Sequence, residues 1–520
     1  MRRASGWAAA LILTLTALAL GHADDAWIPG GGLPALDRIP LVAMLLLLAH
    51  GLVGRRRLAL RTTLGLAAVA ALLPPVHWQR LVLPVAAAVI LMADRDSYVV
   101  RAQTRRLRAA STIAVLAYVV VLLAGVWASV RRGESLGRAA SAALPIPPVG
   151  AEGPGRVLVP LALVALLAAL ALSLAAAPAP PPSDEADRAR VRDLVQNPVA
   201  GSLAPFVTRA DRTYVFNPRG DTAIGYRVRF GVALAGGDPV GPAPAEAIAA
   251  FVRLCERYGW RPAVLGADTA AIGELWRRAG VRRAVDIGDE AVLDLSTFSL
   301  ASRRMRNVRQ AARRADNAGV RVEVGALDPA LVPALREVLR DWLHGRRERG
   351  FAMNLDAMLT PRADTVYAVA RDAAGRPVAF ARFPVAAGGR ILSLDVAPRR
   401  HDAPNGVVER MVIAVVEHAR EAGAVEVTLN FAGMRRVYSG ELRGARLLQL
   451  PLRALDRWIE LRSLYLFTSK FHPGWRPRQL RLRSWWELIP VAVAALTAEF
   501  GAEPGRDDRT EFHPLRIRTR

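Results

Sequence analysis

The chain has 520 residues, of which 52% are hydrophobic, and it carries a formal net charge of +24 at neutral pH. This length exceeds a single ordinary domain, so two or three compact units are expected. The single cysteine, Cys255, excludes an intramolecular disulfide framework, and the eight histidines show no metal-ligand spacing, so no metal site is predicted. The positive charge favours anionic partners, either nucleic acid or an acidic lipid surface.

Apolar runs dominate residues 1–177, in contrast to the evenly mixed remainder of the chain. A helix needs about 20 apolar residues to span a bilayer core of about 30 Å, and the last two runs are long enough to do so. We therefore expect a multi-span α-helical membrane region of about six helices over residues 1–177. The runs are Trp7–Leu20, Ile39–Val53, Thr62–Leu73, Leu81–Ala93, Ala110–Val130 and Val157–Ala177.

Arginines concentrate on alternate loops between these runs, with three at positions 55–57 and five between 95 and 108. By the positive-inside rule this pattern predicts a multi-pass protein of the cell membrane with a cytoplasmic C-terminal domain. A cleaved signal peptide over residues 1–22 is the alternative. Residues 178–194, Pro-rich and then charged, are expected to form a linker.

Two later stretches share one plan of strand, loop, helix and strand. The first runs through Tyr226–Ala235, a loop, Ala245–Tyr258 and Arg261–Leu265. The second runs through Arg390–Val396, a loop, Val407–Ala422 and Ala424–Asn430, with Gly423 as the helix stop. The repetition predicts an α/β domain with two tandem units.

Residues 303–314 are expected to form an amphipathic helix with one apolar and one basic face. Arg303, Arg306, Arg309 and Arg313 gather opposite the apolar positions, with no carboxylate between them. A solvated surface face and a binding surface for tRNA or lipid phosphates are equally compatible with this pattern.

Several short motifs occur in order over about residues 195–485. They are Gly237-Asp238-Pro239, Phe298-Ser299-Leu300, Arg304-Met305-Arg306-Asn307, Asp341-Trp342-Leu343, Glu348-Arg349-Gly350-Phe351, Asp395, Ala403-Pro404-Asn405-Gly406, Leu429-Asn430-Phe431-Ala432 and Lys470-Phe471-His472-Pro473-Gly474-Trp475-Arg476-Pro477-Arg478. Together they resemble the C-terminal synthase domain of the phosphatidylglycerol lysyltransferase (multiple peptide resistance factor) family, in a short form similar to actinobacterial members.

The resemblance implies two tandem acetyltransferase-like (GNAT) folds, the first over 195–325 and the second, catalytic one over 326–495, followed by a tail at 496–520. It implies a membrane-bound transferase that moves an amino acid, by family default lysine, from aminoacyl-tRNA to phosphatidylglycerol. The product would reduce negative surface charge and confer resistance to cationic peptides. The implied partners are aminoacyl-tRNA, phosphatidylglycerol and the membrane, with a possible homo-oligomer. Because the aminoacyl ester is already activated, no cofactor is expected.

Such a reaction needs a proton acceptor, a binder for the amino acid's ammonium group and a cationic surface. Carboxylates suit the first two roles, so Asp395 and then Glu348 are the predicted catalytic residues. Asp238 and Asp402 occupy corresponding loops of the two units and are predicted to bind substrate. For each, a helix cap, turn or surface ion pair is the alternative.

Further substrate-binding candidates surround the helix start near residue 406. Arg399 and Arg400 flank a turn, and Asn405 and Gly406 lead into a helix whose N-terminus favours a phosphate. The sequence from Arg400 to Gly406 lacks the glycine pattern with which acetyltransferases hold coenzyme A, which speaks against an acetyl-CoA enzyme.

The motif from residue 470 to 478 supplies the remaining candidates, together with Asn430. Lys470 is the only lysine in the chain and is predicted to contact substrate, although chance retention is an alternative. Trp475 beside Arg476 and Arg478 is predicted to bind the tRNA end or lipid phosphates by stacking and charge, with a core tryptophan as the alternative.

Two other functions remain compatible with the sequence. One is acyl or aminoacyl transfer to another lipid or a cell-wall precursor, because this fold is widely reused. The other is a non-catalytic membrane transport or scaffold protein.

Overall fold

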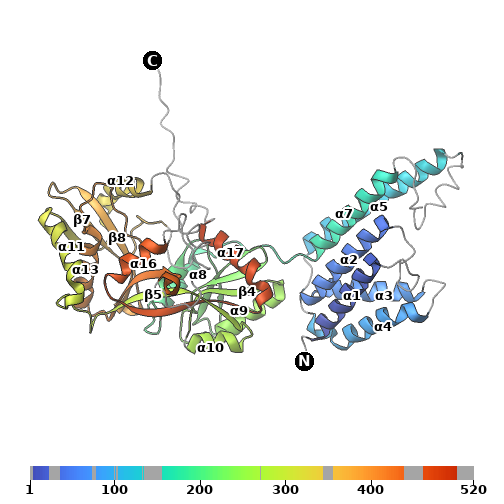
Figure 1. The fold of residues 1–520 in the computed structure, drawn as a ribbon, viewed down its shortest axis with the longest axis horizontal. Helices are drawn as coiled ribbons and strands as arrows, with labels where there is room; N and C mark the ends of the chain where they lie inside the picture. The colour runs from blue at the N-terminus through green and yellow to red at the C-terminus, as the bar shows by residue number, and fades with distance from the viewer. Residues whose placement is uncertain are drawn as a thin grey trace, which may run out of the picture. The chain divides into compact units, whose positions relative to one another are not determined.

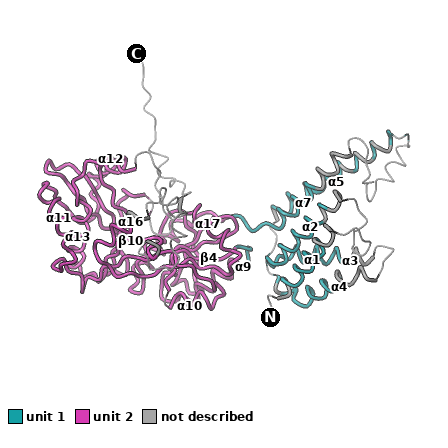
Figure 2. The backbone as a smooth tube through the Cα atoms, in the orientation of Figure 1, with its two compact units in different colours: residues 1–178, 256–260 teal, residues 179–255, 261–520 magenta. Residues whose placement is uncertain are grey.

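The computed structural model describes residues 4–22, 35–72, 78–98, 100, 104–131, 133, 155–269, 271–343, 355, 357–438 and 461–500. The chain separates into two compact units, each with a hydrophobic core of its own (Figure 2). The first unit comprises residues 1–178 and 256–260, and the second comprises residues 179–255 and 261–520.

The described part of the first unit is helical (Figure 1). Helix α1 packs against α2, and α5 packs against α7. Leu48, Leu52 and Leu91 are fully buried in the core between them. The elements are α1 (Ala4–His22), α2 (Ala35–Val53), α3 (Arg57–Leu72), α4 (Trp78–Ala93), η1 (Arg95–Ser97), α5 (Thr104–Arg131) and α7 (Gly155–Ser173).

The six apolar runs do form helices, but the expected multi-span membrane region is wrong. Within the described ranges, no helix combines the length and the apolar character needed to cross a membrane. Helices α3 and α4 have 16 residues each, which at about 1.5 Å per residue gives roughly 24 Å against a core of about 30 Å. Helix α5 has 28 residues but includes Arg105, Arg106 and Arg108 near its start.

The second unit is built on one 11-stranded sheet in the order β1-β2-β3-β4-β11-β5-β10-β9-β8-β7-β6. The strands are β1 (Thr213–Phe216), β2 (Ala223–Arg229), β3 (Val232–Gly236), β4 (Arg261–Asp268), β5 (Arg283–Asp294), β6 (Arg321–Gly325), β7 (Thr365–Arg371), β8 (Pro377–Ala386), β9 (Ile391–Ser393), β10 (Glu426–Gly433) and β11 (Gly474–Leu482).

The two ends of this sheet repeat one arrangement. At one end β1, β2 and β3 are antiparallel and β4 joins β3 in parallel. At the other end β6 to β9 are antiparallel and β10 joins β9 in parallel. This agrees with the α/β part of the expected fold, two tandem units on one plan.

The two halves exchange their last strands in the middle of the sheet. Strand β5 of the first half pairs with β10 of the second, and β11 of the second half pairs with β4 of the first. β11 and β5 also pair with each other along nine residues of β11. Because β5 and β11 each carry side chains into the other half, residues far apart in the sequence meet at this junction.

Helices flank the sheet, and α13 packs against α11 and against β6, β7 and β8. Met411, Val412 and Val415 of α13 are fully buried, as their three- and four-residue spacing predicts. The remaining elements are α8 (Glu185–Val195), η2 (Ala204–Thr208), α9 (Pro244–Tyr258), α10 (Ala271–Arg278), η3 (Arg303–Met305), α11 (Arg306–Asn317), η4 (Pro329–Leu331), α12 (Val332–Leu343), η5 (Ala387–Gly389), α13 (Val407–Glu421), α14 (Arg435–Tyr438), α16 (Leu461–Ser469), η6 (Trp485–Glu487) and α17 (Leu488–Phe500).

Some local elements differ from the expectations. The single strand expected over 226–235 is a hairpin, because Phe230 and Gly231 both adopt positive φ, at 49° and 74°, and turn the chain between β2 and β3. The later part of the expected linker is helix α8, whose N-cap Asp184 accepts a hydrogen bond from the Asp187 amide. The expected helix stop at Gly423 is confirmed, with φ of 79°.

Candidate functional site

The central strand β11 places two arginines on one face of the sheet. Alternate residues of a strand point the same way, so Arg476 and Arg478 project together. In the sheet register Arg476 lies opposite Glu290 of β5, and Glu290 in turn lies opposite Phe431 of β10. The site therefore forms where the two halves exchange strands.

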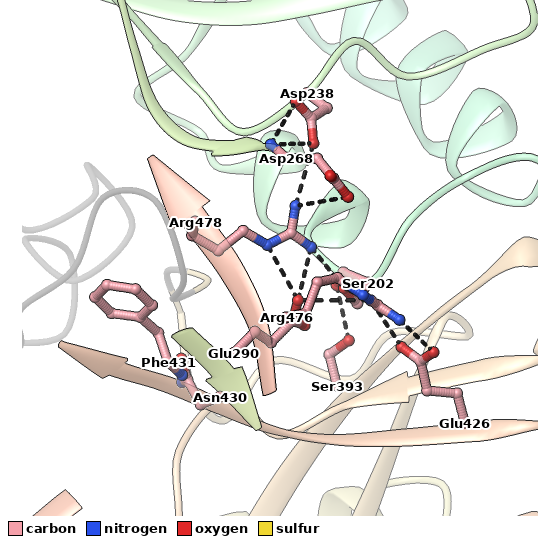
Figure 3. A network of polar contacts seen from close by, with 10 residues as sticks. All are labelled: Ser202, Asp238, Asp268, Glu290, Ser393, Glu426, Asn430, Phe431, Arg476 and Arg478. Atoms are coloured by element: carbon pink, nitrogen blue, oxygen red, sulfur yellow. Dashed lines mark hydrogen bonds and ion pairs between the residues drawn. The ribbon is translucent and has the colours of Figure 1, made fainter. Parts of the chain in front are cut away.

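Carboxylates from both halves surround these arginines (Figure 3). Arg478 donates to Glu290 at 2.6 Å and to Asp238 at 3.2 Å, and its guanidinium lies 3.9 Å from Asp268. Arg476 binds both carboxylate oxygens of Glu426, at 3.1 and 2.7 Å. Bidentate contacts of this kind fix the orientation of both partners.

Ser202 joins the two guanidiniums to the second half of the sheet. Its hydroxyl oxygen accepts hydrogen bonds from Arg476 at 3.2 Å and from Arg478 at 3.3 Å. Its carbonyl oxygen accepts a bond of 2.7 Å from the Ser393 hydroxyl on β9. We call the whole set the acidic network; it comprises Ser202, Asp238, Asp268, Glu290, Glu426, Arg476 and Arg478 (Figure 3).

The acidic network holds more negative than positive charge. Four carboxylates face two guanidiniums, and the Glu290 side chain is fully buried. The Oε1 atom of Glu290 accepts no hydrogen bond from the part of the chain that the structure describes. A buried carboxylate oxygen of this kind attracts a cationic donor.

Burial and charge act in opposite directions on the ionisable groups of the network. Burial raises the pKa of the Asp238 carboxyl to about 6, although the Arg478 guanidinium lowers it. Burial by itself lowers the pKa of Arg478, but the carboxylates of Glu290 and Asp238 raise it above its usual value. Arg478 therefore stays charged, whereas Asp238 titrates near neutral pH.

Asp395, the first predicted catalytic residue, lies in a fully buried ion pair. Its Oδ2 accepts a bond of 2.6 Å from Arg382 Nε, and its Oδ1 accepts one of 3.2 Å from the Leu355 amide. Arg382 also donates to the carbonyls of Leu355 and Ala357. Burial raises the pKa of Asp395, although the Arg382 ion pair opposes this shift.

Asn430 connects this ion pair to the acidic network. It adopts a left-handed φ of 70° at an irregularity in β10, and its side-chain amide donates to the backbone carbonyl of Asp395 at 3.2 Å. The next residue, Phe431, lies opposite Glu290. The structure thus brings Asp238, Asp395, Asn430, Arg476 and Arg478 into one region.

A second group of predicted residues lies at the start of α13. Arg376 donates to Asp402 at 3.0 Å, and Arg400 lies 3.6 Å from the same carboxylate. Arg399 and Asn405 are exposed. Gly406 has φ of 97°, and a Cβ there would collide with the Ala311 carbonyl of α11. Close packing of α13 on α11 therefore requires this glycine.

The amphipathic helix predicted over 303–314 is present as η3 and α11. Arg303, Arg306 and Arg313 are exposed, while Val308 and Ala311 are buried. Arg309 differs, because its guanidinium donates to the carbonyls of Leu300 and Ser302 and so fastens the preceding loop.

Lys470 and Trp475 make their contacts with residues outside the acidic network. Lys470 forms a 2.8 Å ion pair with Glu409 of α13 and is half-exposed. Trp475 is partly buried, with the Arg435 guanidinium 5.0 Å from its ring centroid. Glu348 lies outside the described residues.

The sequence interpretation missed Glu290, Ser202, Glu426 and Arg382. Glu290 directly precedes three apolar residues, 291 to 293, of the same strand. A charged residue next to an apolar stretch of a strand indicates a partner of opposite charge on a neighbouring strand. The sequence does not indicate which strand that is, because Arg478 lies 188 residues away. The described residues contain no cluster that could hold a metal ion.

Comparison with known sequences supports the motif-based prediction. Residues 192–481 match the family described as "Phosphatidylglycerol lysyltransferase, C-terminal". An MprF-like domain protein of Mycobacterium tuberculosis is 37% identical over 327 residues, which is 60% of this chain and 67% of that protein. A lysylphosphatidylglycerol biosynthesis bifunctional protein LysX of Nocardia farcinica is 36% identical over 67% of this chain, but the match spans only 32% of that protein.

Solved structures show the same fold. The C-terminal domain of a putative lysylphosphatidylglycerol synthetase from Agrobacterium fabrum is 26% identical, with a TM-score of 0.53, over 61% of this chain and 98% of that one. L-PGS from Bacillus licheniformis, at 19% identity, has a TM-score of 0.51 over 62% of this chain and 99% of that one.

These matches confirm the family predicted from the motifs and its class of enzyme, a transferase. The matched segment covers the exchanged strands, the acidic network and the Asp395 ion pair. The chain belongs, by residues 192–481, to the phosphatidylglycerol lysyltransferase family.

Proposed function

We propose that the protein transfers an amino acid from aminoacyl-tRNA to phosphatidylglycerol and binds the amino acid's ammonium group at the acidic network. The observation that carries this proposal is the buried Oε1 atom of Glu290, which has no hydrogen-bond donor in the described chain, within a network of excess negative charge. A protonated amine supplies both a donor and a compensating charge.

The charge of the network favours a dibasic amino acid such as lysine. With Asp238 ionised, the residues of the acidic network comprise four carboxylates and two guanidiniums, an excess of two negative charges within this set. An esterified lysine carries two ammonium groups, on Cα and on the side chain, whereas an esterified alanine carries one. Lysine therefore neutralises the network more completely.

In the proposed reaction a glycerol hydroxyl of the lipid attacks the ester carbonyl. A new ester bond forms to the glycerol oxygen, the bond to the tRNA ribose oxygen breaks, and the hydroxyl proton passes to that leaving oxygen. Asp395 and Glu348 are the proposed proton carriers. Asp395 accepts hydrogen bonds from Arg382 and from the Leu355 amide, and both bonds favour its ionised form and so oppose uptake of the proton.

Other predicted residues are proposed to hold the two large substrates. The exposed arginines of α11 suit the tRNA or lipid phosphates, together with Trp475. Arg399, Arg400, Asp402, Asn405 and Gly406 at the α13 start, and Lys470, are proposed to line the substrate path. We propose that the reaction takes place at the cytoplasmic face of a membrane, where charged tRNA is available, and that its product gives resistance to cationic peptides.

The test is transfer in vitro by the full chain, with purified lysyl-tRNA and alanyl-tRNA compared on phosphatidylglycerol vesicles. We expect lysyl transfer to be the faster. Replacing Glu290→Gln removes a charged hydrogen-bond acceptor worth about 1.5–3 kcal/mol, which raises the KM for lysyl-tRNA roughly 10- to 100-fold.

The matched control is Glu185→Gln, which changes an exposed glutamate of α8 in the same way. This variant should transfer lysine and alanine with the same kinetics as the parent protein. Unchanged kinetics in Glu290→Gln would contradict ammonium binding at the acidic network, whereas absence of any amino-positive lipid with every charged tRNA would contradict the proposed function itself.

A further inference from the structure

Helix α17 is apolar on two opposite faces. Val491, Ala494 and Ala498 are fully buried and pack against the sheet beneath β2 and β3. Ile489, Val493 and Leu496 lie within an arc of about 60° on the opposite side, at 3.6 residues per turn. A helix that is apolar all round is normally covered on every side.

The outward face of α17 is nevertheless exposed. Trp486 and Ile489 are 87% and 77% exposed, the two highest values among the large apolar side chains that the structure describes. Trp485, Val493 and Leu496 are 45–51% exposed. We call these five residues the α17 apolar face. Apolar side chains gathered on one face in this way mark a surface that binds another apolar body.

Arginines border the N-terminal end of the α17 apolar face. Strand β5 begins at Arg283, whose register partner Leu482 ends β11, just before η6 and α17. Arg282 and Arg283 are exposed, and the Arg283 guanidinium lies 5.7 Å from the Trp485 ring centroid. The nearby carboxylate of Glu487 is half-buried and accepts a hydrogen bond from the Arg483 amide.

The α17 apolar face and the arginines that border it contain the residue types found at a membrane surface. Tryptophan concentrates at the level of the lipid headgroups, aliphatic side chains enter the outer acyl region, and arginine pairs with anionic headgroups. Helix α17 has 13 residues, which gives a length of about 20 Å. It suits a helix that lies in the interface plane.

We propose that the α17 apolar face docks the second unit onto an anionic bilayer, with Trp486 and Ile489 inserted between the lipids and Arg282 and Arg283 at their headgroups. The choice of a lipid surface rests on the proposed function, in which the acceptor is an anionic lipid. A surface-bound enzyme meets that lipid without extracting it from the bilayer.

The test measures the fluorescence of a label attached to a single position of the full chain. Ile489→Cys is labelled with an environment-sensitive fluorophore; the native Cys255 is fully buried and does not compete. Leu466→Cys is the matched control, since Leu466 is an exposed leucine of α16 with 52% exposure. Each protein is mixed with vesicles of phosphatidylcholine alone or with added phosphatidylglycerol, in the absence of tRNA.

We expect the label at 489 to shift to shorter wavelength with vesicles, more strongly when phosphatidylglycerol is present, and Trp486→Ser to reduce the shift. The label at 466 should not shift. An unchanged label at 489, or equal shifts at both positions, overturns the proposal. A shift at 489 that follows protein concentration without vesicles also overturns it, in favour of a second copy of the chain. Because no transfer is required, loss of the proposed transferase activity leaves this readout intact.

Discussion

The buried ion pair between Asp395 and Arg382 predicts a large loss of stability in Asp395→Asn. Both side chains are fully buried and their charged atoms are 2.6 Å apart. The substitution keeps the shape of the side chain but leaves the guanidinium without its counter-charge. Breaking a buried pair in this way costs about 3–5 kcal/mol of the free energy of unfolding.

The expected fall in melting temperature follows from that cost. For a unit as long as residues 179–255 and 261–520, an unfolding entropy of about 2.1 cal/mol/K per residue means that about 1 kcal/mol corresponds to roughly 1–2 °C. The lower figure of about 3 kcal/mol then gives a fall of roughly 3–6 °C. Calorimetry on the full chain measures it as a shift of the transition of the second unit.

The matched control is Asp402→Asn, which removes the charge from an exposed pair. Asp402 lies 3.0 Å from Arg376 and its side chain is 57% exposed, so about 1 kcal/mol or less is expected. The reasoning is refuted if Asp395→Asn melts within experimental error of Asp402→Asn.

A double variant separates structure from chemistry at Asp395. Adding Arg382→Gln removes the unpaired charge, so the double variant should regain much of the lost stability. If Asp395 carries the proton, the stabilised protein stays inactive; if its role is structural, transfer returns together with the melting temperature.

Two further predictions follow from the structure. Because burial raises the pKa of Asp238 to about 6, its contribution to stability is present below pH 3.8, its ordinary pKa, and is lost as the pH rises through about 6. The parent should therefore lose stability relative to Asp238→Asn as the pH rises from about 4 to 7, as urea unfolding across a pH series will show. A variant with the same pH dependence as the parent would contradict the assignment. Gly406→Ala should cost about 2–5 kcal/mol, because it adds a collision with the Ala311 carbonyl to the strain of a positive φ. Gly423→Ala, with φ of 79° and open space around its Cβ, should cost only about 1–2 kcal/mol; equal melting temperatures would rule out the close contact of α11 and α13.

Local periodicity predicted helices α9, α11 and α13 and strands β4, β9 and β10 of the second unit. The helix starting at Val407 and the amphipathic helix of α11 appear where apolar spacing placed them, because burial of one face decides helix position. The hairpin at Phe230 and Gly231 was missed, since a positive φ at phenylalanine is rare and a single glycine within a strand pattern is a weak turn signal. The membrane prediction over 1–177 was wrong. It rested on apolar composition and on two runs of sufficient length, whereas no helix among the described residues combines the length and the apolar character needed to cross a membrane.

The sequence by itself determined the family, the basic face of α11 and the candidates Asp238, Arg476 and Arg478, because motifs and periodicity are local in the chain. Only the tertiary structure decided which charges meet. Glu290 and Arg478 are joined by the exchange of β5 and β11, and strand pairing between distant segments depends on how the whole core packs, which no local pattern encodes.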